Sequence, residues 1–505
     1  MQYVDWIVLG GYLLVIVLLG IWVGRRQKNT EEYFVGGRQV PWWAAGLSLF
    51  GTSISTGTFI AMPGQAYGGD WTYFFPNLMV IPAALVVAWL VIPFYRRVAR
   101  MSAYEFLEHR FGYGARVYAA LLTLINAIFW MGMILFLMAK AIHAMTGWDI
   151  YLVAIVTGAI AVTYTTVGGL QAVIWTDVLQ SITLFGGGLF CIGALLLAAD
   201  GGELVQTAYE ADKFVLPELS LNLLAPSILV MAMFGFLDLT DGRACSQGSV
   251  QRYLAVPTTR DAQKSVIFGS LSSLVTWIIF IAIGTLLFSY YRLNPELLPD
   301  NIAAKETQVF PYFVMSELPV GVTGMILAGI CAATMSSLDT VINMSALITV
   351  YDFYGRFRPE ASDRTKLLLG KASALGYGIL GVAIALWLIA SGVEEALKFN
   401  MKVFSILGGA RLGLFILGMF VRRAHAVGVY IGLVVGVLVS LWGSMDVVLV
   451  NFDVDMETIE RVRFPLHTLM VLFCTNVATV LVGWWASLLI PDRSGRDATG
   501  WTVFD

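Results

Sequence analysis

Thirteen stretches of the sequence are long, apolar and almost free of charged residues. Each has about 20 residues or more, the length that an α-helix needs to cross the hydrocarbon core of a bilayer. This pattern predicts an all-α integral membrane protein of about 13 transmembrane helices, with residues 1–505 forming a single transmembrane domain. The stretches are 5–24, 42–67, 72–95, 114–145, 149–167, 176–199, 222–241, 263–290, 319–350, 366–392, 396–420, 425–449 and 466–490.

The composition excludes the soluble classes of protein. Hydrophobic residues make up 58% of the chain and charged residues 13%, against about 25% charged residues in a soluble domain. A net charge of −3 provides no basic field for nucleic acid. The four histidines are dispersed and form no zinc-protease motif. We therefore expect a protein that is not an enzyme, with the lipid bilayer around it, no nucleic acid, no organic cofactor and no obligatory protein partner.

The cations predict the orientation in the membrane. Alternate connectors carry 22 lysines and arginines on one side and 7 on the other, among them Arg243 and Arg252 on the richer side. Because cytoplasmic connectors are enriched in cations, we expect the N-terminus outside and the C-terminus in the cytoplasm. Opposite sides require an odd number of spans, which agrees with thirteen.

Two of the expected spans contain many helix-breaking residues. The second span has Gly51, Gly57 and Pro63 interleaved with hydroxyl side chains, and the seventh carries the charged segment 238–243. Irregular backbone at membrane depth is tolerated only where it lines a cavity or is buried in protein. Close packing of small residues is the alternative explanation, but it accounts less well for hydroxyls that point in all directions.

Broken helices five spans apart are typical of an inverted repeat of five plus five helices, with substrate and ion bound at the breaks. We therefore expect an extra N-terminal helix at 5–24, a first repeat together with the start of the second over 42–241, a second repeat over 222–420, and two extra helices over 425–490.

The ninth span carries groups that suit a hard cation. Ala333, Ser336 and Ser337 are spaced to lie on one helix face, and Asp339 and Thr340 follow. Sodium prefers oxygen ligands such as hydroxyls, carbonyls and carboxylates, and a carboxylate inside the membrane suggests a function. Asp177, at the start of the sixth span, is either a helix-end acid or a cation ligand.

Three segments resemble signatures of the sodium:solute symporter family, which includes bacterial galactose, proline and sialic acid symporters. They are GGLQAVIWTDVLQ at 168–180, AATMSSLDTVIN at 332–343 and GGARLGLFILGMFVRR at 408–423. The resemblance extends from the first span to about residue 440. It implies a LeuT-like core over spans two to eleven, Na⁺ as the coupling ion, and a bacterial plasma membrane as the location.

The resemblance also implies sodium ligands. The first site would take carbonyl oxygens from Gly51, Ile54 and Ala333 and hydroxyls from Ser336 and Ser337. A possible second sodium site would combine Ser336 with three further residues, namely Asp177, Asp339 and Thr340.

The predicted solute pocket lies between the broken helices and their neighbours. Its candidate residues are Ser55, Thr58, Met62, Asn77, Trp130, Asn400 and Lys402. Sialic acid symporters of the family carry an arginine where this sequence has Trp130, which disfavours a sialic acid. Residues 238–243 replace an aromatic-rich stretch of the family, so they either form an unusual pocket with Asp238, Asp241 and Arg243 paired, or lie at the cytoplasmic end. For Arg411 a structural pair with an acid is favoured.

These observations predict a secondary active transporter that imports a small polar solute with sodium by alternating access. A sugar or polyol is favoured, because Asn, Thr, Ser and Trp offer hydrogen bonds and stacking faces. A small carboxylate ranks second because of Lys402 and Arg411. A proton-coupled transporter using Asp177 or Asp339, and an uncoupled channel or sensor, are the remaining alternatives.

Overall fold

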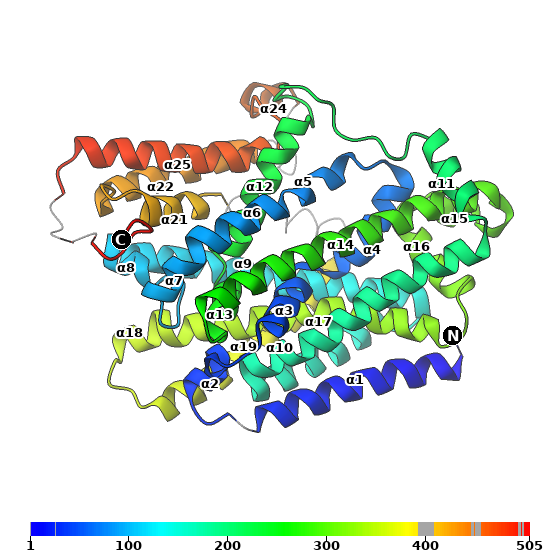
Figure 1. Ribbon diagram of the computed structural model, residues 1–505, viewed down its shortest axis with the longest axis horizontal. Helices are drawn as coiled ribbons and strands as arrows, with labels where there is room; N and C mark the ends of the chain where they lie inside the picture. Colours follow the sequence, from blue (N-terminus) through cyan, green and yellow to red (C-terminus); the bar gives the residue numbers. More distant parts are fainter. Residues whose placement is uncertain are drawn as a thin grey trace.

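The computed structural model describes residues 2–25, 27–391, 409–445, 449, 456–492, 496 and 499–505. Every regular element in those ranges is a helix (Figure 1). In chain order the helices are α1 (Tyr3–Gly24), α2 (Thr30–Val35), α3 (Trp42–Ser53), α4 (Thr56–Gly68), α5 (Phe75–Leu78), α6 (Val80–Val86), α7 (Ile92–Val98), α8 (Glu105–Phe111), α9 (Tyr113–Thr146), α10 (Ile150–Ala198), α11 (Gly201–Glu210), α12 (Ile228–Ala244), α13 (Gln247–Ala255), α14 (Thr259–Leu293), α15 (Asp300–Ala303), α16 (Glu306–Ser316), α17 (Val322–Ile348), α18 (Gly355–Phe357), α19 (Asp363–Ser391), α21 (Arg411–Phe420), α22 (Ala426–Gly443), α24 (Met456–Val462) and α25 (Met470–Leu489).

The described part of the chain holds nine helical segments that are long and apolar enough to cross a membrane, and the bent pair α3–α4 adds a tenth. The sequence predicts thirteen spans. The two numbers differ because α10 covers two of the expected stretches, α12 and α13 are each short, and the stretch 396–420 lies partly outside the described residues. The all-helical membrane architecture is as predicted, and the count of thirteen stays a prediction.

Helix α10 cannot be one straight transmembrane span. Its 49 residues would extend about 74 Å at 1.5 Å per residue, well beyond the thickness of a bilayer. The helix kinks at Gly169, whose φ of 52° lies in the region that glycine favours. A Cβ there would lie 2.5 Å from the carbonyl oxygen of Tyr33, so α2 packs directly against the kink.

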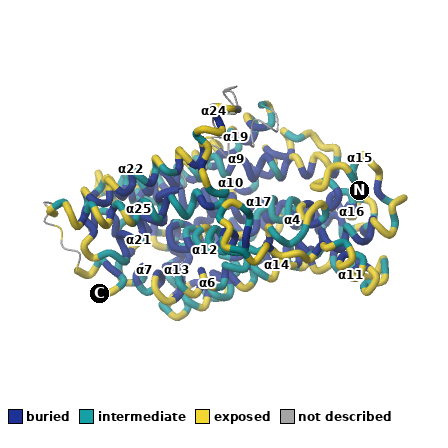
Figure 2. The backbone as a smooth tube through the Cα atoms, turned by 90° about the horizontal axis from the view of Figure 1, so that it is seen from above, coloured by how far each residue is buried: buried dark blue, intermediate teal, exposed yellow. Residues whose placement is uncertain are grey.

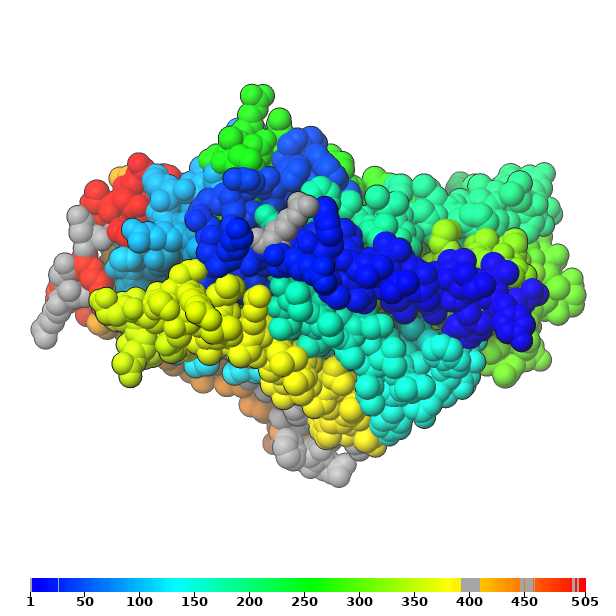
Figure 3. Space-filling view, turned by 90° about the horizontal axis from the view of Figure 1, so that it is seen from below, coloured from blue at the N-terminus to red at the C-terminus, as the bar shows by residue number. Residues whose placement is uncertain are grey.

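The helices run along the long axis of the molecule, and the two termini lie at opposite ends of it (Figure 1). Helix α17 belongs to the most buried of the candidate membrane spans. In the most apolar 18 residues of the segment Val322–Phe357, which begins with α17, 94% of the residues are buried, against 28% in α1, α19 and α25. Figure 2 shows the buried backbone inside and the exposed backbone around it. On the face drawn in Figure 3, α1 lies beside a segment of α10.

The interruption predicted in the second span is present, whereas the one predicted in the charged segment of the seventh span is displaced beyond that segment. Helices α3 and α4 meet at an angle of 58°, because Ile54 and Ser55 between them are extended. Helix α12 runs through the charged segment 238–243 without a break, and the interruption follows it at Cys245 and Ser246.

Candidate functional site

The break in the second span faces two serines of α17. The Ser336 hydroxyl donates to the carbonyl of Gly51 at 3.0 Å, and the Ser337 hydroxyl donates to the carbonyl of Thr52 at 3.5 Å. Both hydroxyls are also 3.3 Å from the carbonyl oxygen of Ala333. The last carbonyls of a helix lack an i+4 amide partner within it, so the end of α3 presents carbonyl oxygens to this serine pair, although that of Gly51 also accepts from the Ile54 amide at 3.2 Å.

Further hydroxyl contacts join the broken span to α17. Thr52 Oγ1 and Thr340 Oγ1 lie 3.0 Å apart on one side of the serines, and Thr56 and Thr334 share a hydrogen bond on the other. The contacts therefore extend over residues 334–340, about two turns of α17. They place oxygen atoms from both sides of the break against one buried helix face.

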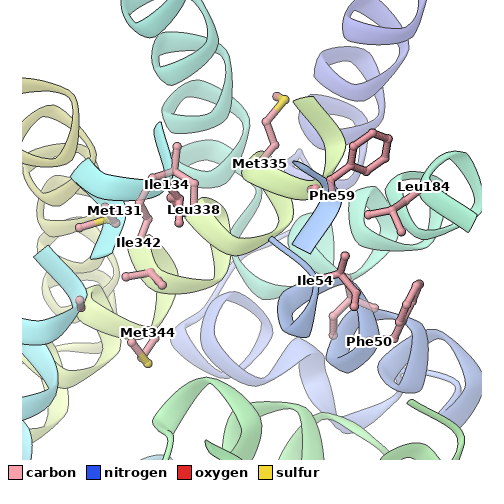
Figure 4. Packing of buried hydrophobic residues seen from close by; sticks show 14 of the residues in the cluster. Phe50, Ile54, Phe59, Met131, Ile134, Leu184, Met335, Leu338, Ile342 and Met344 are labelled. Carbon is pink, nitrogen blue, oxygen red and sulfur yellow. The ribbon is translucent and has the colours of Figure 1, made fainter. Parts of the chain in front are cut away.

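Apolar side chains hold α17 in this position. Phe50 and Ile54 come from α3 and the break, and Ile54 is fully buried. Figure 4 shows α17 packed between two apolar groups, one formed by Phe50, Ile54, Phe59 and Leu184, the other by Met131 and Ile134 against Leu338 and Ile342. The serines are thus fixed by packing on both sides of their helix.

The predicted first sodium ligands are brought together by this arrangement. Gly51, Ala333, Ser336 and Ser337 are buried and linked by hydrogen bonds, and Ile54 is the extended residue that directly follows α3. Neutral hydroxyls and carbonyl oxygens are suitable ligands for a hard monovalent cation. The site therefore has the chemistry that sodium requires.

A second polar network surrounds Asp177 on α10. One carboxylate oxygen, Oδ2, accepts a hydrogen bond from Arg252 Nη2 at 3.1 Å and another from the Ser48 hydroxyl. The other oxygen, Oδ1, is buried and has no hydrogen-bond partner among the described residues. Asp177 is therefore a buried carboxylate with one free oxygen.

Arg252 is the centre of this network. Its guanidinium donates to Ser48 Oγ at 2.7 Å, Thr340 Oγ1 at 2.6 Å, Thr52 Oγ1 at 3.1 Å and the Gly248 carbonyl at 2.8 Å, in addition to Asp177. The residue is 1% exposed. A fixed cation thus sits against two members of the predicted second sodium site, Asp177 and Thr340.

Asp339, the third member, is fully buried, as Asp177 is. Its Oδ2 accepts from the Tyr164 hydroxyl at 2.9 Å, and its Oδ1 accepts from Thr340 Oγ1 at 3.4 Å. Thr340 contacts both Arg252 and Asp339. The three predicted residues consequently belong to one connected buried network.

A cavity of about 350 Å³ adjoins this network. It lies between the two interruptions and receives side chains from α3, α9, α12, α13, α14 and α17. Asp238 is exposed to it, and no hydrogen bond from a described residue reaches its carboxylate. Its polar and aromatic lining residues include Thr52, Trp130, Asp238, Arg243, Ser246, Ser249 and Arg252.

The predicted solute contacts are only partly gathered around this cavity. Within the described residues, Trp130 lines it, whereas four others do not: Ser55, Thr58, Met62 and Asn77. The Asn77 side-chain amide donates to the Phe74 carbonyl at 3.2 Å. The remaining two, Asn400 and Lys402, fall outside the described residues.

Part of the charged segment of α12 lines the cavity, as in the first of the two alternatives, but without the internal pairing of that alternative. Asp241 pairs with Arg411, whose Nε is 3.1 Å from Asp241 Oδ1. Arg243 donates to Ser270 Oγ at 3.0 Å and to the Leu239 carbonyl at 3.3 Å. The structural pairing expected for Arg411 is therefore present, and Asp238 is left facing the cavity.

Arg252 is the residue that sequence reasoning missed. It was counted with Arg243 among the surface cations of a connector, but both are buried, at 1% and 8% exposure. One signal was available: the apolar run 253–256 follows Arg252 before Pro257, which indicates that the helix continues inside the protein. Removing both from the count leaves 20 cations against 7, so the charge asymmetry persists.

Comparisons with known proteins agree with this arrangement. The sequence profile of the sodium:solute symporter family matches residues 33–436. The chain is 33% identical to the sodium/sialic acid symporters of Aliivibrio fischeri, covering 87% of each chain, and of Proteus mirabilis, covering 87% of this chain and 89% of the relative. It is 27% identical to the human sodium-coupled monocarboxylate transporter 1, covering 87% and 72%.

Solved structures give the same result for the fold. A substrate-bound outward-open Na⁺-coupled sialic acid symporter matches with a TM-score of 0.87 and 29% identity, over 97% of this chain and 98% of that chain. The nucleobase-cation-symport-1 family transporter Mhp1 matches with a TM-score of 0.57 and 15% identity, over 93% and 97%, which supports the fold alone. The relatives of known sequence and the sialic acid symporter structure are named as sodium-coupled transporters, in agreement with the expectation that the chain is not an enzyme.

Proposed function

This chain belongs to the sodium:solute symporter family and is a sodium-coupled membrane transporter with a LeuT-like fold, and we propose that it imports a sugar-sized, hydroxylated solute by alternating access. The observation that carries the proposal is the contact between the serine pair of α17 and the carbonyls at the end of α3.

Sodium is proposed to bind where Ser336 and Ser337 meet Gly51, Ile54 and Ala333. In the structure, the serine hydroxyls donate hydrogen bonds to the carbonyls of the broken span. A sodium ion would accept lone pairs from the same hydroxyls and carbonyls, and would replace these hydrogen bonds by ion–oxygen contacts. Since its ligands come from α3 and α17 together, bound sodium would hold the two helices in one arrangement. That arrangement would complete the neighbouring solute pocket.

A second sodium position is proposed at Asp177, with Asp339, Thr340 and Ser336 as its neighbours. The free Oδ1 of Asp177 supports this assignment. The guanidinium of Arg252 already neutralises the other carboxylate oxygen, so a sodium ion there would share Asp177 with Arg252 or displace it.

The solute is proposed to bind in the 350 Å³ cavity. Three features support a hydroxylated solute. The exposed carboxylate of Asp238 can accept two hydrogen bonds from neighbouring hydroxyls, the hydroxyls of Ser246 and Ser249 can donate or accept, and Trp130 offers an apolar ring face. A neutral sugar or polyol fits these groups best.

An acidic solute is the second candidate. The relatives named as sialic acid symporters transport an acidic sugar, and another relative is named for monocarboxylates. Arg243 lines the same cavity and could face a carboxylate. Against this, Asp238 would repel an anion that came close to it.

We further propose that the protein lies in the plasma membrane, a bacterial inner membrane, with its N-terminus outside. The cation-rich connectors support this orientation. The position of the termini at opposite ends of the molecule agrees with termini on opposite sides of the membrane, but does not distinguish the two sides. The two interruptions, in the α3–α4 and α12–α13 spans, support a first repeat that starts at α3 and a second that starts at α12.

The solute can be identified from electrical currents. The purified protein is reconstituted on a solid-supported membrane, and neutral sugars, polyols, a sialic acid and small monocarboxylates are added in sodium buffer. We expect an inward current with at least one hydroxylated compound, and its loss in the Asp238→Asn variant. A current with unbranched monocarboxylates alone would exclude the sugar and polyol assignment.

A further inference from the structure

A second polar cavity lies at the cation-rich end of the molecule, far along the chain from the transport site. It has a volume of about 400 Å³ and lies where the connector between α21 and α22 meets the end of α25. Four arginines line it, Arg110, Arg422, Arg423 and Arg496, with Asp492 as the carboxylate among its lining residues. The cavity therefore has an excess of positive charge.

Not all of this charge is available to a ligand. Arg110 is buried and donates to the carbonyls of Gly418 at 3.2 Å and Val421 at 2.6 Å, so it satisfies the end of α21. Arg422 is paired with Asp505 at 3.2 Å. Arg423 is exposed and makes no hydrogen bond or ion pair with another described residue. A free guanidinium thus remains at the cavity.

The beginning of α22 adds to the attraction for an anion. His425 caps this helix: its Nδ1 accepts from the Gly428 amide, which leaves Nε2 to donate to the Ile490 carbonyl at 2.8 Å. Both ring nitrogens of His425 are therefore occupied by backbone partners. The first amides of α22 and the positive end of its dipole point toward the same connector that carries Arg422 and Arg423.

The walls of the cavity continue into a lipid-facing surface. Leu488 lines the cavity and is 40% exposed, and its neighbour Leu489 is 77% exposed at the end of α25. Trp484 and Trp485, one turn earlier, are also exposed, and tryptophan is enriched at the boundary between headgroups and hydrocarbon. A ligand in this cavity can consequently have a charged head among arginines and an apolar tail along α25.

We propose that this cavity binds the phosphate of an anionic phospholipid headgroup, with Arg423 as the ligand-contacting cation and Arg422 and Arg496 beside it. Arginine is suited to phosphate because its planar donors match the phosphate oxygens. Free phosphate shares this chemistry, but the exposed leucines at the rim favour a lipid. The inference is independent of which solute the protein transports.

The test uses the full-length protein in detergent and native mass spectrometry with added phosphatidylglycerol or phosphatidylcholine. We expect the wild type to retain phosphatidylglycerol, and the Arg423→Gln variant to retain several-fold less. Arg423→Lys should keep an intermediate amount, since it keeps the charge but loses the planar donors. The matched control is Arg364→Gln, an exposed arginine in another cation-rich connector, which should bind like the wild type.

Three results would overturn the proposal. The first is equal retention of phosphatidylglycerol by Arg423→Gln and the wild type, with Arg364→Gln unchanged. The second is equal retention of phosphatidylcholine and phosphatidylglycerol by the wild type. The third is displacement of the lipid by inorganic phosphate at equal concentration, which would identify a site for the free anion. Because Arg423 is exposed, its replacement should not prevent folding, and an unchanged elution volume in size-exclusion chromatography checks this.

Discussion

At the scale of single residues, the hydrogen bond from Ser336 to the Gly51 carbonyl joins the ninth span to the broken second span. Sodium binding at this place would exchange that bond for ion contacts. The serines have no charge, so their contribution rests on position alone, and α17 supplies the position through packing on both sides.

Ser336→Ala and Ser337→Ala should each weaken sodium activation. Each removes one oxygen ligand, and a buried polar contact of this kind contributes about 1–2 kcal/mol, or roughly a 5- to 30-fold rise in the sodium concentration for half-maximal transport. The solute concentration for half-maximal transport at saturating sodium should change less. If the variants show the same sodium dependence as the wild type, these serines are not sodium ligands.

Arg252→Gln should make the stability of the protein depend more strongly on sodium. The variant leaves the buried Asp177 carboxylate without its counter-charge, and breaking a buried pair in this way costs about 3–5 kcal/mol. Sodium at Asp177 would supply the missing charge and recover part of the loss. Thermal unfolding with sodium or choline as the only added cation measures the difference in Tm.

The double variant Asp177→Asn/Arg252→Gln is the matched control, because it removes both charges. Its Tm should respond to sodium less than that of Arg252→Gln. If sodium raises the Tm of Arg252→Gln no more than it raises that of the wild type, Asp177 is not a sodium ligand.

Single residues also show where sequence reasoning reaches its limit. Ser336, Ser337 and the glycines of the second span could be predicted, because their spacing and chemistry are local properties of the sequence. The contact of Arg252 with Asp177 could not, since 75 residues separate them and the rule for counting surface cations has no information on burial. Trp130 was predicted at the solute site and does line the cavity. Asp238 lines the same cavity, but the sequence does not specify which face of α12 points toward it.

At the scale of helices, the break between α3 and α4 is stabilised by close contacts with a continuous helix, α14. A Cβ at Gly284 would lie 2.1 Å from the carbonyl oxygen of Pro63 in α4, and one at Gly269 would lie 2.6 Å from that of Gly46 in α3. Backbone thus meets backbone on both sides of the break. The sequence showed these glycines but not which helices they bring together.

Gly284→Ala should therefore destabilise the protein and lower transport, because the added methyl group must push α4 away from α14. The expected loss is about 1–3 kcal/mol, as for other over-packed cores, visible as a lower Tm. Gly186→Ala in α10 is the control, because a Cβ there has nothing within 4 Å and alanine favours helix. Equal Tm values for the two variants would contradict this account of the packing.

At the scale of the whole molecule, the membrane class followed directly from the apolar stretches, whereas the span count did not. The expected stretches 149–167 and 176–199 form one kinked helix, and no sequence rule locates a kink that depends on the contact of Gly169 with Tyr33. The predicted orientation rests on the cations alone, so it is open to a direct measurement.

An impermeant maleimide applied to whole cells tests the orientation. A cysteine at Glu203 in α11 should react from outside, and a cysteine at Arg364, which is also exposed, should react only after permeabilisation. Three of the four native cysteines are buried and the fourth is half-buried, so the background labelling by maleimide should be small. The reverse pattern of labelling would place the N-terminus in the cytoplasm.

The most direct test of sodium-coupled uptake is accumulation of the transported solute by proteoliposomes under an inward sodium gradient with the inside negative. Each sodium that enters at 100 mV provides about 2.3 kcal/mol, roughly 50-fold accumulation per ion. We predict transient accumulation above the external concentration with sodium, and none when choline or potassium replaces it. Equal accumulation in the absence of sodium would contradict the account.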